Sequence, residues 1–401
     1  SGLVGSEMCI RDRYSVVFPS FPALSVLPVR ADLYQKQYSH DILVLEYASS
    51  SPLWFDNVKT GIPVLFSWTQ GIHSEIWPGY VSHVTKVVGS QRNNTMEVHC
   101  VSSGYPLKER ATRVFTDCTI PDAVAQICKE FDFNFVGKQH ARRFDQLTMA
   151  GHSYWEWLQE QAKRIGYGVV ISGTDLFFKP LDELINSKGT SIPILSIQAN
   201  DQVVRNKYLD KTLDYFKVTS GENIEKENLR SVKEVHGVDP YTAKKVTGIS
   251  NPKLAGDSLR KSVNDVLFTE PRSEQVVHSK IDADSTSLGL AQHGRFNMPA
   301  NVKGQGDPRI RPFFPVFISG TGESTDGYWI ANEVHHMFHK IGDYQIEMTV
   351  SSDGVGMTNY SFYRQEPDSV IGMVNLAEVS ASLQNQDLVN YRQELFLTKQ
   401  V

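Results

Sequence analysis

Short stretches in which apolar and polar residues alternate dominate the first quarter of the chain. Four such stretches, rich in β-branched and aromatic residues, lie at 41–47, 62–69, 79–88 and 95–101, with Gly, Ser and Asn between them. A period of two places one face of a strand in a core and the other face toward solvent. The pattern therefore predicts an antiparallel β-barrel or β-sandwich over residues 14–110.

Helical periodicity begins after Thr119. This residue is suited to cap a helix, because Pro121 and Asp122 stand in the turn that follows it. One face of the predicted helix carries a row of apolar side chains: Ile120, Val124, Ile127, Cys128 and Phe131. A strand is expected directly afterwards, at 133–136.

A second helix is marked at both of its ends. Ser153 and Glu156 have the spacing of a capping box, and Gly166 suits the left-handed position just beyond a helix. The expected buried face consists of Trp155, Leu158, Ala162 and Ile165. A β-hairpin is predicted next, at 168–178. These elements together predict a small α+β domain over residues 111–190.

Strand patterns return in the second half of the chain. The expected strands are 207–220, 312–318, 327–334 and 344–350. Between the first two of them, residues 221–301 are polar with mixed charges. We therefore expect a second β domain, built from 191–220 and 302–367, which is interrupted by 221–301 as an inserted polar subdomain.

The two ends of the chain differ from the rest. Residues 6–13 resemble translated sequencing-adapter DNA, and 1–13 lack the features of a signal peptide, so we expect 1–13 to be an artefact outside the fold. Residues 368–401 are rich in Gln and Asn, with helical spacing in places. We expect this C-terminal tail to be mobile or to dock on a partner.

Composition narrows the class of protein. With 401 residues, of which 40% are hydrophobic and 21% charged, the chain can build more than one globular core. The formal net charge of −5 gives no bulk attraction to nucleic acid or anionic lipid, and we expect the basic cluster at 138–143 to be solvated surface. The 4 cysteines include no Cys-x-x-Cys pair, which favours reduced thiols. No apolar stretch of about 18 residues predicts a membrane-spanning helix.

His335, His336 and His339 form the group that most suggests a metal site. On a helix, His335 and His339 would share a face and could bind zinc. The flanking pattern instead indicates a strand, on which these two residues would lie roughly 13 Å apart at about 3.3 Å per residue. We therefore expect no metal ligands here.

Few residues of the sequence indicate an enzymatic function. Cys118 with His140 and His152 could form a thiol nucleophile with a base, but a small buried residue just before a helix is the commoner case. The sequence has no Gly-rich phosphate loop, dinucleotide fingerprint or Ser nucleophile elbow, and Gly-Thr-Gly at 320–322 is expected to be a hairpin turn. We predict no catalytic, cofactor-binding or metal-binding residue, and no cofactor.

Aromatic residues at the start of the second helix could form a platform for carbohydrate. Packing explains Trp155 first, because it falls on the predicted core face, whereas Trp157 and Tyr154 could be exposed and belong to an interface. Asn93 begins a glycosylation sequon, which we interpret as a turn in a protein made in a cytoplasm.

The order of these segments is similar to that of a known family. In the α+β part the shared segments are Asp-Ala at 122–123, Phe-Asp-Gln at 144–146, Ser-x-Trp-x-x-Leu at 153–158, Gly-Tyr at 166–167 and Leu-Phe-Phe at 176–178. Near the C-terminus they are Phe-Ile-Ser-Gly at 317–320, Tyr-Trp-Ile at 328–330, Val-His at 334–335 and Gly-Asp-Tyr at 342–344. Through them the chain resembles the phage tail baseplate hub family. This family includes the T-even and Mu-type hubs and late-control protein D, and it is related to the N-terminal part of type VI secretion spikes.

The resemblance implies an α+β, mainly β fold in which two tube-like antiparallel β-barrel domains flank the small α+β domain. It also implies a homotrimer, whose ring adapts a six-fold tail tube to a three-fold central spike protein. Tail tube or other baseplate proteins would be further partners, and DNA would pass through the channel without specific binding. Such a protein would belong to the virion tail baseplate, be assembled in the cytoplasm of a host bacterium and not insert directly into a membrane.

Two other functions stay open at this point. A tail-associated peptidoglycan hydrolase could lie within 221–301, although that segment has no convincing carboxylate pair or nucleophile with a base. The hub part of a contractile secretion spike would have the same fold. The interpretation we prefer is a structural tail hub that is not an enzyme.

Overall fold

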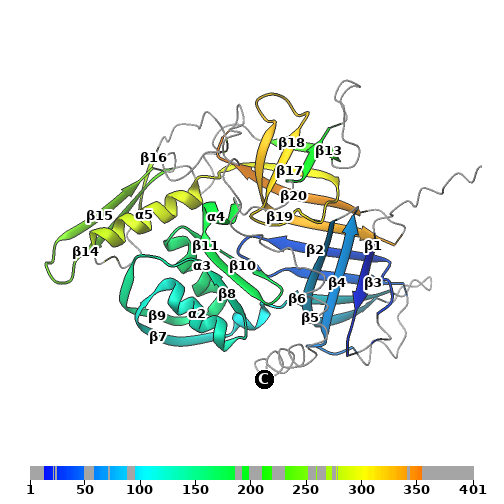
Figure 1. The fold of residues 1–401 in the computed structure, drawn as a ribbon, viewed down its shortest axis with the longest axis horizontal. Coiled ribbons are helices and arrows are strands. Elements are labelled where there is room, and N and C mark those ends of the chain that lie inside the picture. The colour runs from blue at the N-terminus through cyan, green and yellow to red at the C-terminus, as the bar shows by residue number, and fades with distance from the viewer. Residues whose placement is uncertain are drawn as a thin grey trace, which may run out of the picture.

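Strands dominate the computed structural model, in which two barrels lie beside a smaller α+β part (Figure 1). The structure describes residues 13–20, 22, 25–48, 58–70, 73–87, 95–185, 192–197, 210–218, 231–251, 259, 268–272, 277, 279–340 and 344–354. Asn93, residues 1–12 and the tail at 368–401 therefore lie outside the described residues. The predicted fold class, mainly β with an α+β part, is confirmed.

The described part of the first barrel consists of six antiparallel strands. They are β1 (Arg13–Val17), β2 (Arg30–Lys36), β3 (Ile42–Tyr47), β4 (Pro63–Gln70), β5 (His73–Val87) and β6 (Thr95–Ser102). Their order in the sheet is β1-β4-β5-β6-β3-β2. Alternate side chains are buried, such as Leu43 and Leu45 on β3 and Met96 and Val98 on β6. All four strands predicted in this part are confirmed, and β1 and β2 are additional.

The α+β part follows β6. Its elements are η2 (Tyr105–Lys108), β7 (Arg110–Thr119), α2 (Ile120–Glu130), β8 (Asn134–Gly137), β9 (Arg143–Ser153), α3 (Tyr154–Arg164), β10 (Tyr167–Ser172), β11 (Asp175–Pro180) and α4 (Leu181–Ile185). Both predicted helices begin in full capping boxes, formed by Thr119 with Asp122 and by Ser153 with Glu156. Gly166 follows α3 with a φ of 71°, as predicted.

The two helices bury their predicted faces in one core, but α3 is buried more fully than expected. Trp157 and Tyr154 are only 1% and 3% exposed, so the prediction that they could belong to an exposed interface is wrong. The reason is the pair of strands β7 and β9, which covers this side of α3. Trp157 stacks on Phe115 of β7, and its indole N–H donates to the backbone oxygen of Thr148 of β9 at 3.3 Å.

In the second barrel, the described residues form six strands that are widely separated in sequence. They are β12 (Ile194–Ser196), β13 (Asp210–Val218), β17 (Met298–Gln305), β18 (Pro315–Ser319), β19 (Gly327–His339) and β20 (Tyr344–Ser352). The order β19-β18-β12-β13-β17-β20 closes on itself, because β19 also pairs with β20. Short β12 is parallel to both of its neighbours, and the other ladders are antiparallel.

Strand β17 crosses residue 301, where the sequence pattern places the end of the inserted polar segment. Its first residues, Met-Pro-Ala-Asn at 298–301, have little intrinsic preference for a strand. They are held in place by ladders on both sides, with β13 and with β20. Pairing with these distant strands, which the local alternation of residues does not reveal, therefore makes residues 298–301 part of the second barrel.

A small sheet with one helix lies between β13 and β17 in the sequence. Its elements are β14 (Ser231–Val238), β15 (Lys245–Ser250), β16 (Phe268–Arg272) and α5 (Lys280–Gly294), and the strand order is β15-β14-β16. Helix α5 packs on β14 and β15 around a core of Val235, Val246, Val277 and Ala283. The same helix lies against α3, so this unit docks on the α+β part (Figure 1).

Among the residues that the structure describes, one ladder joins the two barrels. Strand β2 of the first barrel pairs antiparallel with β19 of the second, from Arg30 opposite His339 to Lys36 opposite Glu333. One sheet of 12 strands therefore runs through both barrels (Figure 1). We call this β2–β19 ladder the seam.

The two barrels follow the same plan of strand pairing. The ladders β1–β4, β4–β5, β5–β6, β6–β3 and β3–β2 of the first barrel correspond, in chain order, to β12–β18, β18–β19, β19–β20, β20–β17 and β17–β13 of the second. The second barrel adds the ladder β12–β13. The direction of the first strand is the main difference, since β1 is antiparallel to β4 and β12 is parallel to β18.

Single residues correspond as well. The β5–β6 ladder has an irregularity between Val81 and His83, and the β19–β20 ladder has one at the equivalent place, between Ala331 and Glu333. A β-bulge is a specific feature of a strand, because it bends the strand and redirects its side chains. Its repetition supports the view that the two barrels are two versions of one unit.

The chain also enters the fourth strand of each barrel through the same corner. Gly61 donates its N–H to the oxygen of Val81 at 2.8 Å, and Phe313 donates to the oxygen of Ala331 at 2.9 Å. The φ angles of Gly61 and Phe313 are 85° and 72°. Positive φ is unfavourable for a bulky residue such as Phe. The barrel plan therefore imposes this conformation even where the sequence does not supply a glycine.

Candidate functional site at the junction of the barrels

Polar groups from both barrels meet beside the seam. The hydroxyl of Tyr344 donates to Nδ1 of His336 at 2.9 Å, and Nε2–H of His336 donates to Oε1 of Gln35 at 3.2 Å. The amide nitrogen of Gln35 in turn donates to Asp41 at 2.9 Å. The indole N–H of Trp77 donates to the same carboxylate oxygen at 3.2 Å. A chain of hydrogen bonds thus connects the second barrel to the first.

Burial shifts the pKa of two groups in this series of hydrogen bonds, His336 and Asp41. His336 is fully buried, and burial lowers its pKa to about 3. The imidazole is therefore neutral at neutral pH, which allows one ring nitrogen to accept while the other donates. Burial raises the pKa of Asp41 to about 6, against the hydrogen bonds from Gln35 and Trp77 that favour the carboxylate.

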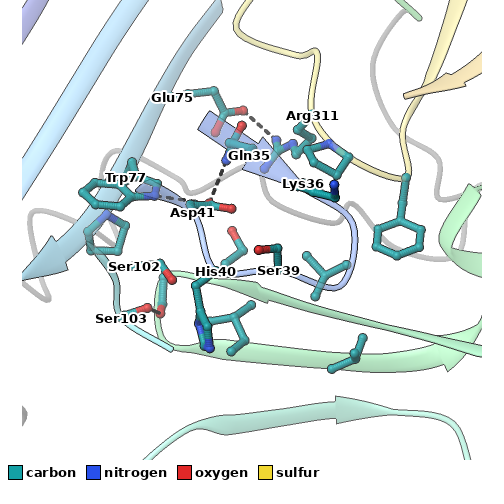
Figure 2. Close-up of a pocket in the computed structure, with 18 of the residues that line it drawn as sticks. Gln35, Lys36, Ser39, His40, Asp41, Glu75, Trp77, Ser102, Ser103 and Arg311 are labelled. Atoms are coloured by element: carbon teal, nitrogen blue, oxygen red, sulfur yellow. Dashed lines mark hydrogen bonds and ion pairs between the residues drawn. The ribbon is translucent and has the colours of Figure 1, made fainter. Parts of the chain in front are cut away.

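A small cavity of about 80 Å³ lies beside these groups, between the two barrels and the α+β part. Figure 2 shows Asp41 with Gln35 and Trp77, and above them Glu75 with Arg311. Arg311 donates to Glu75 at 2.7 Å, and both side chains are mostly buried. Burial raises the pKa of Glu75 to about 7, against the attraction of Arg311. Ligand pockets usually measure about 300–1,000 Å³, so this cavity suits a few water molecules.

A wider hollow of about 1020 Å³ lies on the solvent-facing side of the joined sheet, over β2, β13, β17, β19 and β20. Charged side chains on its floor form pairs between neighbouring strands. Lys36 of β2 pairs with Glu333 of β19, and Lys303 of β17 pairs with Glu347 of β20. Within each pair the two charges largely cancel, so the floor presents no strong electrostatic field of either sign.

The three histidines considered as metal ligands lie on one strand, β19, as predicted. His335 bonds to Asp32 at 2.8 Å on the solvent-facing side, whereas His336 points into the core. Neighbouring residues of a strand point to opposite faces, so the structure does not gather His335, His336 and His339. Burial alone would raise the pKa of Asp32, but hydrogen bonds from His335 and Arg30 hold this pKa below its ordinary value. In the described part of the chain, no group of three His, Cys, Asp or Glu could hold a metal.

Cys118 has a packing role at the end of β7. It is 4% exposed, and burial raises the pKa of its thiol. A thiol with a raised pKa is a poor nucleophile, because the thiolate is the reactive form. The two histidines considered as bases lie in different surroundings: His140 packs edge-on against Tyr167, and His152 is exposed on β9.

The segment Gly-Thr-Gly at 320–322 connects β18 to β19, so the predicted hairpin turn is confirmed. Asp326 accepts the backbone N–H groups of Gly320, Thr321 and Gly322 at 3.1, 2.8 and 3.1 Å. The chain's own carboxylate therefore occupies the position that a phosphate would need.

The basic cluster at 138–143 is not solvated surface throughout. Lys138 and Arg143 pair with carboxylates at the surface, as expected. The side chain of Arg142, however, is only 11% exposed and pairs with the fully buried Asp282 of α5, to which Arg164 also donates at 3.3 Å. The expectation is wrong for Arg142, because a helix distant in the sequence covers it.

Sequence reasoning singled out none of Gln35, Asp41, Glu75 and Arg311. Each stands among ordinary strand or loop residues, and no local spacing marks a polar group that will be buried against another domain.

Among the described residues, no helix is long and apolar enough to cross a membrane.

Solved structures with the same fold come from phage tails and a secretion system. The tail protein from Neisseria meningitidis MC58 has a TM-score of 0.61 and 10% sequence identity, over 86% of this chain and 98% of that chain. The 43 kDa tail protein of prophage MuSo2 from Shewanella oneidensis has a TM-score of 0.59 and 12% identity, over 86% and 99%. This chain has the fold of phage tail proteins. The predicted resemblance is thereby confirmed at the level of the fold.

A further structure of this tail-protein fold is an Escherichia coli component of the type VI secretion system. Its TM-score is 0.51 at 9% identity, over 90% of this chain and 79% of that chain, and it is described as similar to the T4 bacteriophage tail proteins gp27 and gp5. By sequence alone, no family model and no curated protein matches the chain. The tail-protein fold is therefore recognised from its three-dimensional arrangement.

Proposed function

We propose that this chain is a structural protein of a bacteriophage tail, the baseplate hub, and that three copies form a ring. One observation carries the proposal: two barrels with the same strand plan lie side by side, joined at the seam. Three copies supply six like barrels in a three-fold arrangement. Such a ring can meet a six-fold tail tube on one side and a three-fold central spike protein on the other.

The wide hollow on the joined sheet supports a role in passing DNA without binding it. We place this face toward the channel of the ring. Its paired lysines and glutamates give DNA phosphates no array of unpaired cations, which is what nonspecific binding requires. The formal net charge of −5 agrees with this role.

The remaining assignments follow from the same proposal. The protein belongs to the virion tail baseplate and is assembled in the cytoplasm of the host bacterium, with the spike, the tail tube or other baseplate proteins as partners. Its domains are the first barrel at 14–110, the α+β domain at 111–190 and a second barrel from 191–220 and 302–367, extended to include all of β17. The inserted unit within 221–301 docks on the α+β domain through α5.

The polar groups at the junction support a structural role over an enzymatic one. They are bonded to each other, and their cavity is small. A peptidoglycan hydrolase is therefore the weaker alternative. The hub part of a contractile secretion spike is the stronger one, because the secretion-system component has the same fold.

The mass of the full chain in solution tests the ring. Light scattering over a wide range of concentration, followed by negative-stain imaging, should give three times the mass of one chain and a ring with an axial hole. Addition of the cognate spike protein should stabilise that trimer. A monomer at every concentration, with and without the spike, would refute the ring.

A further inference from the structure

Charged groups are unevenly matched where the two barrels meet. Glu75 on β5 and Asp41 between β2 and β3 belong to the first barrel, and Arg311 between β17 and β18 belongs to the second. All three residues line the small cavity at the junction (Figure 2). Arg311 donates to Glu75 at 2.7 Å across the two barrels. Two carboxylates therefore face one guanidinium group, and one negative charge is in excess when both carboxylates are ionised.

The other charges around the cavity do not compensate this excess. Asp307 and Arg309 form a buried pair at 2.6 Å and compensate each other. The charge of Asp307 also disfavours a negative charge on the glutamate of the cavity. Lys211 acts electrostatically on Asp307, and Lys108 acts on His40, but neither lysine contributes to the pKa shifts of the two cavity carboxylates.

The remaining basic residues nearby are neutral or paired. Burial lowers the pKa of His40 and of His336 to about 3, so both rings are neutral at neutral pH. Burial also lowers the pKa of His73, which lies on the same strand as the glutamate. Lys36 lines the cavity but pairs with Glu333. A proton is therefore the simplest way to remove the excess charge.

The cavity also has polar groups that need water. Within the described part of the chain, His40 Nε2 and the indole N–H groups of Trp68 and Trp155 line the cavity and have no hydrogen-bond partner. The three residues are 8%, 4% and 6% exposed. Buried polar groups require a partner, and about 80 Å³ is enough for several water molecules. Water in the cavity can deliver a proton to the carboxylates.

We propose that this cavity makes the contact between the two barrels sensitive to protons: binding of a proton by Glu75, and at lower pH by Asp41, removes the excess negative charge and favours the closed junction. Two carboxylates beside one cation, in a poorly solvated place, hold a proton more tightly than exposed carboxylates do. The inference goes beyond the proposed function and does not depend on the ring, because all three charged groups belong to one chain.

The direction of the effect follows from the two pKa values. Burial raises the pKa of Glu75 from 4.5 to about 7 and that of Asp41 from 3.8 to about 6. Opening of the junction returns both groups to water and to their ordinary values, so the open form binds fewer protons. The protons therefore stabilise the closed form fully below about pH 4, and this stabilisation is lost as the pH rises through 6 and 7. Between pH 5 and 8, opening should become roughly seventyfold more frequent through Glu75 and roughly tenfold through Asp41.

Hydrogen exchange of the full chain measures this opening. The N–H of Gln37 donates to the backbone oxygen of Asn332 at 2.8 Å, so its exchange reports on the contact of the two barrels. Exchange at this amide, corrected for the intrinsic effect of pH, is compared between the wild type and E75Q from pH 5 to 8. The ratio of wild-type to E75Q opening should rise roughly seventyfold over this range. Titration of His40 and His336 cancels in the ratio, because both proteins contain them.

Two further variants complete the exchange experiment. With D41N in place of E75Q, the ratio should rise roughly tenfold. E97Q is the matched control, because Glu97 lies on the neighbouring strand β6 and its side chain is 36% exposed. The ratio of wild-type to E97Q opening should stay constant with pH.

Infrared spectra give a readout that does not depend on how often the junction opens. At pH 6, the wild type should show a protonated carboxyl group that is missing from E75Q, because the pKa of Glu75 is about 7. If E75Q does not fold, D41N carries both measurements, with the infrared comparison made at pH 5.

The outcomes decide the inference in either direction. A rising exchange ratio together with the additional protonated carboxyl group would support the proton-sensitive contact. A constant ratio would overturn it, even if the carboxyl group is protonated, because the proton would then not favour closure. A rise of equal size in the ratio for E97Q would also overturn it. The mass in solution is measured separately, so failure of the ring would leave this inference standing.

Discussion

Replacement of Asp282 by Asn should release the inserted unit from the α+β domain. Asp282 is fully buried near the start of α5, where Arg142 pairs with it and Arg164 donates to both of its oxygens at 3.3 and 3.4 Å. Thr286 donates to it at 3.2 Å. One carboxylate therefore compensates two guanidinium groups whose side chains are only 11% and 15% exposed.

The size of this effect follows from the two guanidinium groups, which lose their compensating carboxylate. Removal of one partner of a buried ion pair costs about 3–5 kcal/mol, because an uncompensated charge is left in a poorly solvated place. Each 1.4 kcal/mol is a factor of ten in an equilibrium, so opening of α5 should become roughly a hundredfold to several thousandfold more frequent. Hydrogen exchange of the α5 amides measures this local opening without requiring the whole chain to unfold in one step.

The variant D284N is the matched control. Asp284 lies on the same helix, but its side chain is 50% exposed and pairs with Lys280 across one turn. Such a pair contributes about 0.3–0.5 kcal/mol, so exchange should change by less than roughly threefold. Equal exchange in D282N and D284N would show that the buried pair does not hold α5, and would refute the reasoning.

Three further changes test other parts of the fold. Burial lowers the pKa of His336 to about 3, from 6.5, so below pH 6.5 the unfolded chain binds a proton at this residue that the folded chain does not. The contribution of His336 to stability should be full above pH 6.5, and stability should fall by about 1.4 kcal/mol per pH unit below it. Urea unfolding of H336Q should show a shallower decline of stability with acid. G166A should reduce thermal stability more than G151A. Both glycines have a φ of 71°, but a Cβ at Gly166 would meet Gln292 of α5, whereas a Cβ at Gly151 would face open space. Equal effects of the two substitutions would contradict the docking of α5 on this turn. W157A should cost about 3–5 kcal/mol by urea unfolding, because this side chain is 1% exposed, and a loss under 1 kcal/mol would contradict its place in the core.

Local chemistry made some of this fold predictable. The helices at Thr119 and Ser153 are readable because a capping box satisfies backbone groups within four residues. The turn at Gly166 is readable because a positive φ favours glycine. Strands β3, β4 and β6 are readable because one buried face forces a period of two.

Other features depend on contacts that local patterns do not contain. Trp157 lies off the predicted core face of its helix, so the sequence allows it to be exposed at an interface; strands β7 and β9, whose own alternation is weak, cover it instead. Arg142 looks like surface in a run of basic residues until α5, far along the chain, supplies Asp282. The junction residues Gln35, Asp41, Glu75 and Arg311 are polar groups whose burial depends on how three domains meet.

The sequence by itself determined the class of fold, the ends of its helices and most of its strands, because caps, turns and alternation act over a few residues. Only the tertiary structure decided that the two β regions are one plan used twice, and that β2 and β19 join them. Strand order and register arise from pairing between residues hundreds of positions apart. The two barrels can therefore keep the same hydrogen-bond plan, down to the corner at Gly61 and Phe313, while their side chains have diverged.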